Sequence, residues 1–299
     1  MLGDLKQLRA FLSVARLGNF TRSAYELNIS PSTLTVQIQQ LEAQLNVTLF
    51  DRNRRRVNLT SAGQELLPRA EHVIQEIENR IEQARDISGT AYGTVTVAAL
   101  PSLAASLLPR AIKILTQQHP HISVRIRDAV AVQVVNIIRN GEVDLGVGCA
   151  IKRDRELEWE SLLLDRVCAF VAVDHPLSSR KGMSLTELVR HPLIMPVRES
   201  SIRMRFETAI ERQGIIAIPA YEAVYNSTVL ALAAEGLGVA VLSELLVGHG
   251  NNTGRLHQID LQGASLDRHI GILKPIGRSL SRPAQLFSEA LKHAAGMTT

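Results

Sequence analysis

The order of strands and helices between residues 92 and 148 constrains the fold of this chain more than any other feature. YGTVTVAAL, at 92–100, alternates and is rich in β-branched residues, which predicts a strand, and SLLPRAIKILTQQHP predicts a helix that ends at Pro120. ISVRIRD predicts a second strand, AVQVVNIIRNG a helix that ends at Gly141, and VDLGVG a buried strand. Strands that alternate with helices in this way are typical of a parallel sheet in an α/β domain.

A second set of strands and helices begins with VCAFVAV, at 167–173. The elements predicted next are the strand LIMPV, the helix SIRMRFETAIERQG, the strand AYEAV, the helix STVLALAAEG and the strand VAVL. RHIGILKP then predicts a return strand, and RPAQLFSEALKHA predicts the final helix. The chain after residue 91 is therefore expected to form two similar α/β halves.

The excess positive charge of the chain lies in its first sixty residues. The 299 residues are enough for about two domains and carry a formal net charge of +4. Residues 1–60 hold eight Lys or Arg and four Asp or Glu, whereas the rest of the chain holds 25 basic and 25 acidic residues. A local basic excess favours a polyanionic partner.

Several features favour a cytoplasmic protein with no metal site and no cofactor. Charged residues interrupt the opening MLGDLKQLRAFLSVA, so no signal peptide is expected. The longest apolar region, 228–248, is broken by Glu235, Glu244 and several glycines, so no membrane span is expected. Cys149 and Cys168 have no CxxC spacing, which favours reduced core thiols over a redox switch or a metal site.

Two short helices are predicted within the first 28 residues. Apolar residues spaced at 3, 4 and 3 from Leu5 to Ala15 form one face of a helix that ends at Gly18-Asn19. In FTRSAYEL, Thr21 is the expected N-cap of a second helix, and Phe20 before it can act as a hydrophobic staple.

The segment NISPSTLTVQIQQLE, at 28–42, predicts a third helix with an unusual outer face. Ser30 is the expected N-cap, and Pro31 occupies the first helical position, where its missing N–H costs nothing. Opposite the stripe that begins at Leu34, the face is small and polar: Ser32, Thr35, Val36, Gln39 and Ala43. Such side chains suit phosphates, base edges and thymine methyls in a major groove, so the second and third helices favour a DNA-binding helix-turn-helix over a merely solvated face.

The segment LFDRNRRRVNLTSAG, at 49–63, favours the DNA-binding interpretation. Val57 and Leu59 flank Asn58 in strand alternation after an arginine-rich turn, which predicts a β-hairpin wing. Arginine suits phosphate contacts and narrow minor grooves.

These residues together resemble the LysR-type transcriptional regulators. The likeness rests on the aromatic-plus-Thr start at Phe20, the Ser-rich third helix that ends in Leu-Glu, then Leu-Phe-x-Arg and Leu-Thr-x-x-Gly, over residues 5–63. Ser23 stands where Ala is usual, Asn46 where Gly is usual and Pro31 where Gln is frequent. The DNA-binding positions expected from the residues and this resemblance are Thr21, Ser30, Pro31, Ser32, Thr33, Thr35, Val36, Gln39, Arg52, Arg54, Arg55 and Arg56.

The resemblance implies an α+β chain of three parts. These are an N-terminal winged helix-turn-helix domain at 1–60, a linker and dimerisation helix at 61–90, and an α/β two-lobed, periplasmic-binding-protein-like effector domain at 91–299. Lobe I is expected at about 91–163 plus 268–299, and lobe II at about 164–267. The linker helix carries a nearly heptad apolar stripe, which suits a partner helix, with packing onto its own domain as the alternative, and Pro68 is expected to kink its first turns.

Ligands of open α/β sheets lie beyond the carboxyl ends of strands, where helix N-termini point. Four strand-to-helix junctions of the chain meet this condition, although each Ser or Asn there could also be a plain N-cap. Ser102 and the Ser200-Ser201 region match effector-binding positions of the family, whereas Ala131 and Cys149 replace polar residues of some relatives. Helix N-termini with Arg198 and Arg203 favour an organic anion. The effector-binding positions expected are Ser102, Leu103, Ala129, Ala131, Cys149, Arg198, Ser200, Ser201, Arg203, Asn226 and Ser227.

The function expected from the sequence is effector-controlled, sequence-specific DNA binding. The alternatives are a DNA-binding regulator without a small-molecule effector and, less favoured, a solute-binding protein. An enzyme is not expected, because the chain has no Gly-rich phosphate loop, HExxH or GxSxG motif. The partners implied are double-stranded DNA, further copies of the chain in a homodimer or homotetramer, a small-molecule effector and RNA polymerase, but no membrane.

Overall fold

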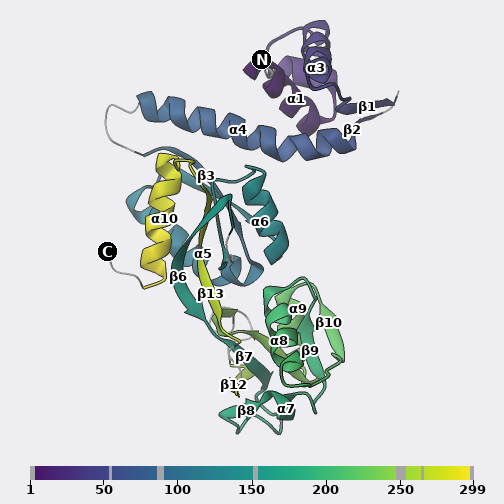
Figure 1. Ribbon diagram of the computed structural model, residues 1–299. Helices are drawn as coiled ribbons and strands as arrows, with labels where there is room; N and C mark the ends of the chain where they lie inside the picture. The colour runs from purple at the N-terminus through teal and green to yellow at the C-terminus, as the bar shows by residue number, and fades with distance from the viewer. Residues whose placement is uncertain are drawn as a thin grey trace. The chain divides into compact units, whose positions relative to one another are not determined.

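The computed structural model describes residues 4–53, 56–85, 91–150, 154–246, 254–263 and 266–296. The chain divides into two compact units, and the main boundary follows Gly93 (Figure 1). Both helices and sheets are present, as expected for an α+β chain. Among the described residues, no helix combines the length and the apolar character that crossing a membrane requires.

The first unit contains three short helices, a two-stranded hairpin and one long helix. Its elements are α1 (Leu5–Leu17), α2 (Phe20–Glu26), α3 (Pro31–Leu45), β1 (Phe50–Asn53), β2 (Arg56–Leu59) and α4 (Ser61–Arg85). The core is formed by apolar residues of α1, α3 and β1, including Phe11, Leu34, Ile38 and Phe50. The rings of Phe11 and Phe50 lie 5.5 Å apart, so the hairpin is fixed to the helices by aromatic packing.

The helix boundaries of this unit follow the sequence except at α2. Gly18 ends α1 in the left-handed region at φ 59°. The N-cap of α2 is Asn19, whose side chain accepts a hydrogen bond from the backbone N–H of Arg22, so the prediction of Thr21 as the cap is wrong. Asn is as good a cap as Thr, and its earlier start places Phe20 inside the helix, where its ring packs on Phe50.

The second unit contains two sheets with helices on their faces. The first sheet has the order β4-β3-β5-β13-β6, formed by β3 (Gly93–Ala99), β4 (Ile122–Asp128), β5 (Leu145–Cys149), β6 (Leu157–Asp165) and β13 (Arg268–Pro275). The β3–β5 pair is parallel, but β13 runs antiparallel to both β5 and β6, so the sheet is mixed. Helices α5 (Pro101–Gln118) and α10 (Arg282–Ala294) pack together on one side, and α6 (Ala131–Arg139) lies on the other (Figure 1).

The second sheet has the order β10-β9-β11-β7-β12-β8. Its strands are β7 (Val167–Ala172), β8 (Gly182–Ser184), β9 (Leu193–Pro196), β10 (Tyr221–Ala223), β11 (Val239–Ser243) and β12 (Leu256–Gln262). Its helices are α7 (Leu185–Leu188), α8 (Ser201–Glu211), α9 (Asn226–Ala234) and the short 3-10 turn η1 (Glu244–Leu246). A large apolar core lies between α8, α9 and this sheet.

The chain passes between the two sheets twice, once at each end of the second one. It leaves the first sheet at Asp165, the last residue of β6, and re-enters it at Arg268, the first residue of β13. The two strands are antiparallel neighbours, and Asp165 is paired in register with Arg268. This crossing positions the site described below.

Candidate DNA-binding face and interlobe cleft

The start of α3 is organised by Ser30. Its hydroxyl accepts a hydrogen bond from the backbone N–H of Thr33 at 3.1 Å and lies 2.8 Å from the hydroxyls of Ser32 and Thr33. Pro31 occupies the first helical position, as the sequence predicts. This cap fixes where the helix begins and therefore which side chains its first turn presents.

Burial separates the two faces of α3. Leu34, Ile38 and Leu41 are buried in the core of the unit. The opposite face is exposed at Ser32, Thr33, Val36 and Gln39, whereas Thr35 is half-buried and its hydroxyl donates to the carbonyl of Pro31. The exposed face is thus short-chained and uncharged, and it offers hydroxyl, amide and methyl groups.

The hairpin is attached to α3 by a carboxylate that the sequence alone does not single out. Glu42 Oε1 accepts backbone hydrogen bonds from Leu49 at 2.7 Å and from Phe50 at 3.3 Å. The Thr60 hydroxyl then donates to the carbonyl of Thr48 and accepts from the backbone N–H of Gly63. Glu42 is the Glu of the Leu-Glu motif and holds the chain where it enters β1. Thr60 is the Thr of Leu-Thr-x-x-Gly and holds the chain where it leaves β2. Both motifs therefore have a physical role in positioning the wing.

The wing forms where the sequence predicts it, as the antiparallel pair β1–β2. Arg52 and Arg56 lie in its strands rather than in its turn. Arg54, Arg55 and the side chains of Arg52 and Arg56 lie outside the described residues. Thr21 is exposed on α2 although it is not the cap.

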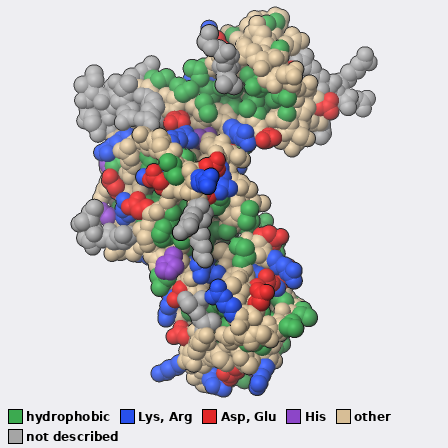
Figure 2. All heavy atoms as spheres, in the orientation of Figure 1, with side chains coloured by type: hydrophobic (Ala, Val, Ile, Leu, Met, Phe, Trp, Pro, Cys, Tyr) green, Lys and Arg blue, Asp and Glu red, His purple; other side chains and the backbone are tan. Residues whose placement is uncertain are grey.

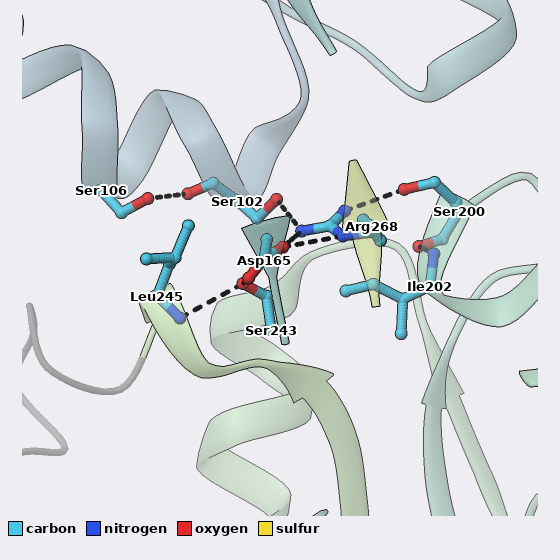
Figure 3. A network of polar contacts seen from close by, with 9 residues as sticks. Ser102, Ser106, Asp165, Ser200, Ile202, Ser243, Leu245 and Arg268 are labelled. Carbon is cyan, nitrogen blue, oxygen red and sulfur yellow. Dashed lines mark hydrogen bonds and ion pairs between the residues drawn. The ribbon is translucent and has the colours of Figure 1, made fainter. Parts of the chain in front are cut away.

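In the second unit, the centre of the cleft between the two lobes is occupied by Arg268. This side chain is 1% exposed, and its Nε donates to Asp165 Oδ2 at 2.8 Å, with a further bond from Nη2 to the same oxygen (Figure 3). Asp165 is fully buried, and its other oxygen accepts from the Ser243 hydroxyl at 2.6 Å. The charge of Arg268 is therefore compensated by a buried carboxylate.

The remaining donors of Arg268 connect the two lobes. Nη2 donates to the hydroxyl of Ser102 in the first turn of α5, and Nη1 donates to the hydroxyl of Ser201 at the start of α8, both at 2.9 Å. Ser102 and Ser201, both predicted from the sequence, thus meet on one guanidinium. Ser200 instead caps α8, because its hydroxyl accepts from the backbone N–H of Ile202 (Figure 3).

The two arginines predicted for the anion site are engaged elsewhere. Arg203 is 3% exposed and forms ion pairs with Glu207 at 2.8 Å and Glu222 at 3.3 Å. Arg198 is largely exposed and lies 3.8 Å from the same Glu207. Among the described residues, neither guanidinium donates a hydrogen bond to Ser102, Ser200 or Ser201.

Two cavities adjoin the network around Arg268, and both are lined in part by Ser201. The smaller, of about 20 Å³, has room for roughly one water molecule and is lined in part by Ser102, Ala131, Ser200, Ser201 and Asn226. The larger, of about 520 Å³, is lined mainly by α6 and α8, with Ala131, Ser201 and Cys149 among its residues. The predicted residues that line neither cavity are Leu103, Ala129, Arg198, Arg203 and Ser227. Leu103 is a core residue, and the backbone N–H of Ala129 donates to Ala99.

No metal centre emerges from the described part of the chain, where no three His, Cys, Asp or Glu side chains are grouped to bind an ion.

The sequence analysis does not identify three residues that organise these sites. They are Asp165 and Arg268 in the cleft and Glu42 beside the wing. Both members of the cleft pair end or begin a strand at the crossing, which is the one signal that could have identified them.

Comparisons with known proteins agree over both units. The family described as "Bacterial regulatory helix-turn-helix protein, lysR family" matches residues 5–64, and "LysR substrate binding domain" matches residues 88–296. The chain is 28% identical to the uncharacterized HTH-type transcriptional regulator YybE of Bacillus subtilis, over 96% of this chain and 97% of that one. It is also 28% identical to the RuBisCO operon transcriptional regulator of Allochromatium vinosum, over 98% and 97% of the two chains.

Solved structures share the fold along the whole chain. CbnR in complex with its target DNA has a TM-score of 0.72 at 19% identity, over 97% of this chain and 99% of that one. A full-length OxyR variant from Pseudomonas aeruginosa also has a TM-score of 0.72, at 21% identity, over 99% and 95% of the two chains.

Proposed function

The chain belongs to the LysR family of DNA-binding transcriptional regulators with an effector-binding domain, and we propose that a small organic anion bound between its two lobes controls its DNA binding. The observation that carries this proposal is the ligand-sized cavity lined by both lobes, directly beside the Arg268 network that joins them. A ligand that fits one arrangement of the lobes better than another shifts the population of the two arrangements.

The DNA contact is assigned to α3 and the wing. The small, uncharged outer face of α3 allows close approach to a major groove, where Val36 can meet a thymine methyl and Gln39 a base edge. Arginines of the wing supply the sequence-independent attraction to phosphate. Because Val36 is 48% exposed on this face, methyl and shape complementarity form a large part of the expected readout.

Assembly through α4 is part of the same proposal. Val73 and Ile81, which belong to the apolar stripe of this 25-residue helix, are 42% and 43% exposed. Figure 2 shows hydrophobic side chains gathered along α4. A second copy that covers this stripe would make a homodimer, and a pair of dimers a homotetramer, with recognition helices in successive major grooves. Such a regulator needs no cofactor, acts where DNA is, in the cytoplasm, and has RNA polymerase as a further partner.

The DNA-binding part is tested by changing Arg54, Arg55 and Arg56 together to Ala in the full chain. Affinity for a specific operator fragment, found by footprinting the upstream region of its own gene, is measured from low to moderate salt. The slope of log affinity against log salt should become shallower by about 0.9 for each phosphate that the variant no longer neutralises. A matched variant removes three exposed cations of the second unit, Lys113, Arg190 and Arg282, and should leave the slope unchanged. An unaltered slope in the wing variant would contradict the assignment of the wing to DNA.

A further inference from the structure

The arginines near the cleft differ in whether a carboxylate of the protein already neutralises their charge. Arg268 and Arg203 are buried against carboxylates, and Arg198 shares Glu207. Arg205 and Arg212, on the other hand, form no ion pair with any described carboxylate, and both line the larger cavity. For an anion that enters the cleft, the uncompensated positive charge therefore lies at Arg205 in α8 and at Arg212, the C-cap of that helix, rather than at Arg268.

The wall beside these two arginines is apolar. Residues 205, 208 and 209 line the cavity from one face of α8, and Arg212 is the C-cap of that helix. Val132 and Val135 of α6 line the same cavity. Buried Leu100, Val134 and Leu273 complete the wall. Val132 and Met204 are 57% and 39% exposed although they are large and apolar, so a ligand in the cavity would remove apolar surface from water.

We infer that the larger cavity binds an amphipathic organic monoanion, a carboxylate with an aromatic or branched aliphatic body. The apolar body lies between α6 and α8, and the carboxylate pairs with the guanidinium groups of Arg205 and Arg212. The volume of about 520 Å³ lies in the range of small-molecule sites. This inference rests on the proposed function, since it names the chemical class of the effector and the side of the cleft that holds it.

Compact or neutral ligands match the cavity less well. Inorganic phosphate has the charge but no apolar body to cover Val132 and Met204. Benzamide has the body but leaves the two arginines without an anion. Affinity should therefore require both features at once, which separates this assignment from simple ion binding and from simple hydrophobic binding.

Cys149 provides a reporter in the cavity wall. It is half-buried and lines the larger cavity, whereas Cys168 is 2% exposed and burial raises the pKa of its thiol to about 12. Alkylation of the full-length native protein by N-ethylmaleimide at pH near 8 should therefore label Cys149 and spare Cys168. The rate of labelling, followed by mass spectrometry, then measures occupancy of the cavity without any DNA in the reaction.

Benzoate and 4-methylpentanoate are the probes for the two kinds of apolar body. At least one of them should slow the labelling of Cys149. Benzamide or inorganic phosphate should need at least about tenfold higher concentration for the same protection, because losing one charge-assisted hydrogen bond weakens binding by about that factor. Changing both Arg205 and Arg212 to Ala should raise the half-protecting concentration by about tenfold or more. Arg190→Ala removes another exposed cation of the same lobe, one that forms no ion pair with a described carboxylate, and should leave the half-protecting concentration within about twofold.

Three outcomes would overturn the inference. They are no protection by either carboxylate at concentrations on the order of tens of millimolar, equal protection by benzamide, and unchanged protection in the double arginine variant. None of these outcomes depends on DNA binding, so they can refute the cavity assignment without refuting the proposed DNA-binding function. Conversely, an unchanged salt slope in the wing variant would refute the DNA assignment and leave the thiol result as it is.

Discussion

Replacing Arg268 by Met tests whether the buried pair holds the two lobes in their observed arrangement. The change removes the guanidinium but keeps an unbranched side chain, and it leaves the carboxylate of Asp165, which is fully buried, without its cation. Removing one partner of a buried ion pair costs about 3–5 kcal/mol of unfolding free energy. The hydroxyls of Ser102 and Ser201 also lose their donor, so we expect the upper part of that range.

The single tryptophan of the chain makes this measurement specific. Trp159 lies on β6, the strand that ends at Asp165, so its fluorescence follows the unfolding of the sheet that contains the pair. For a unit of this size, 1 kcal/mol corresponds to a shift in Tm of roughly 2–4 °C, so a cost of about 4–5 kcal/mol should lower the Tm of Arg268→Met by roughly 8–20 °C.

A second substitution separates loss of the pair from general damage. Combining Arg268→Met with Asp165→Leu replaces the ion pair by two apolar side chains, and such replacements are often close to neutral. The double variant should therefore recover most of the missing stability and lie within about 2 kcal/mol of the parent. The reasoning is refuted if Arg268→Met costs under about 1 kcal/mol, or if the double variant is less stable than both single variants.

Three further predictions concern other parts of the chain. Ser30→Ala removes the N-cap of α3 and should cost about 1 kcal/mol of stability and weaken operator binding, whereas Ser30→Asn should retain both; equal losses would show that capping is not the cause. Gly63→Ala would bring a Cβ well inside van der Waals distance of the Leu49 carbonyl, so it should lower the Tm of the first unit, as followed by far-UV circular dichroism; an unchanged Tm would contradict this close packing. Desolvation, and next the charge of His191, lower the pKa of His175 in the folded protein, so the unfolded chain binds more protons than the folded one as pH falls through about 6.5, and the unfolding free energy should fall with pH. His175→Asn should flatten this pH dependence, as measured by urea titrations at several pH values. An unchanged pH dependence in the variant would refute the role of His175.

Local rules in the sequence account for most of the elements. The caps at Ser30 and Gly18 and the apolar stripe of α3 act within a few residues, so the pattern alone locates those helices. Thr21 is the wrong cap because Asn19, two residues earlier, offers an equally good acceptor. A choice between two nearby caps depends on how Phe20 packs on Phe50, which is a tertiary contact.

The strands that the sequence does not predict share a physical cause. β6 carries Glu158, Glu160 and Asp165, and its buried and exposed residues do not alternate regularly. It is an edge strand of its sheet, but its last residue, Asp165, is buried where the chain crosses between the lobes. β8 has three residues, and β12 is polar at Gln258 and Asp260. Such segments become strands because neighbouring strands hydrogen-bond to them, and this information does not lie in their own periodicity.

The buried pair in the cleft follows from topology combined with charge rather than from either alone. A chain that leaves a lobe by one strand and returns by the next has two crossing strands that are neighbours and are covered by both lobes. A charged side chain buried between the lobes is not solvated by water, so it is stabilised only by an opposite charge beside it. Asp165 and Arg268 are both buried and are paired in register on the two crossing strands. The two charges compensate each other at the crossing, so the anion site predicted at the serines has no free cation. The cations of the inferred anion site are instead Arg205 in α8 and Arg212 at its C-cap.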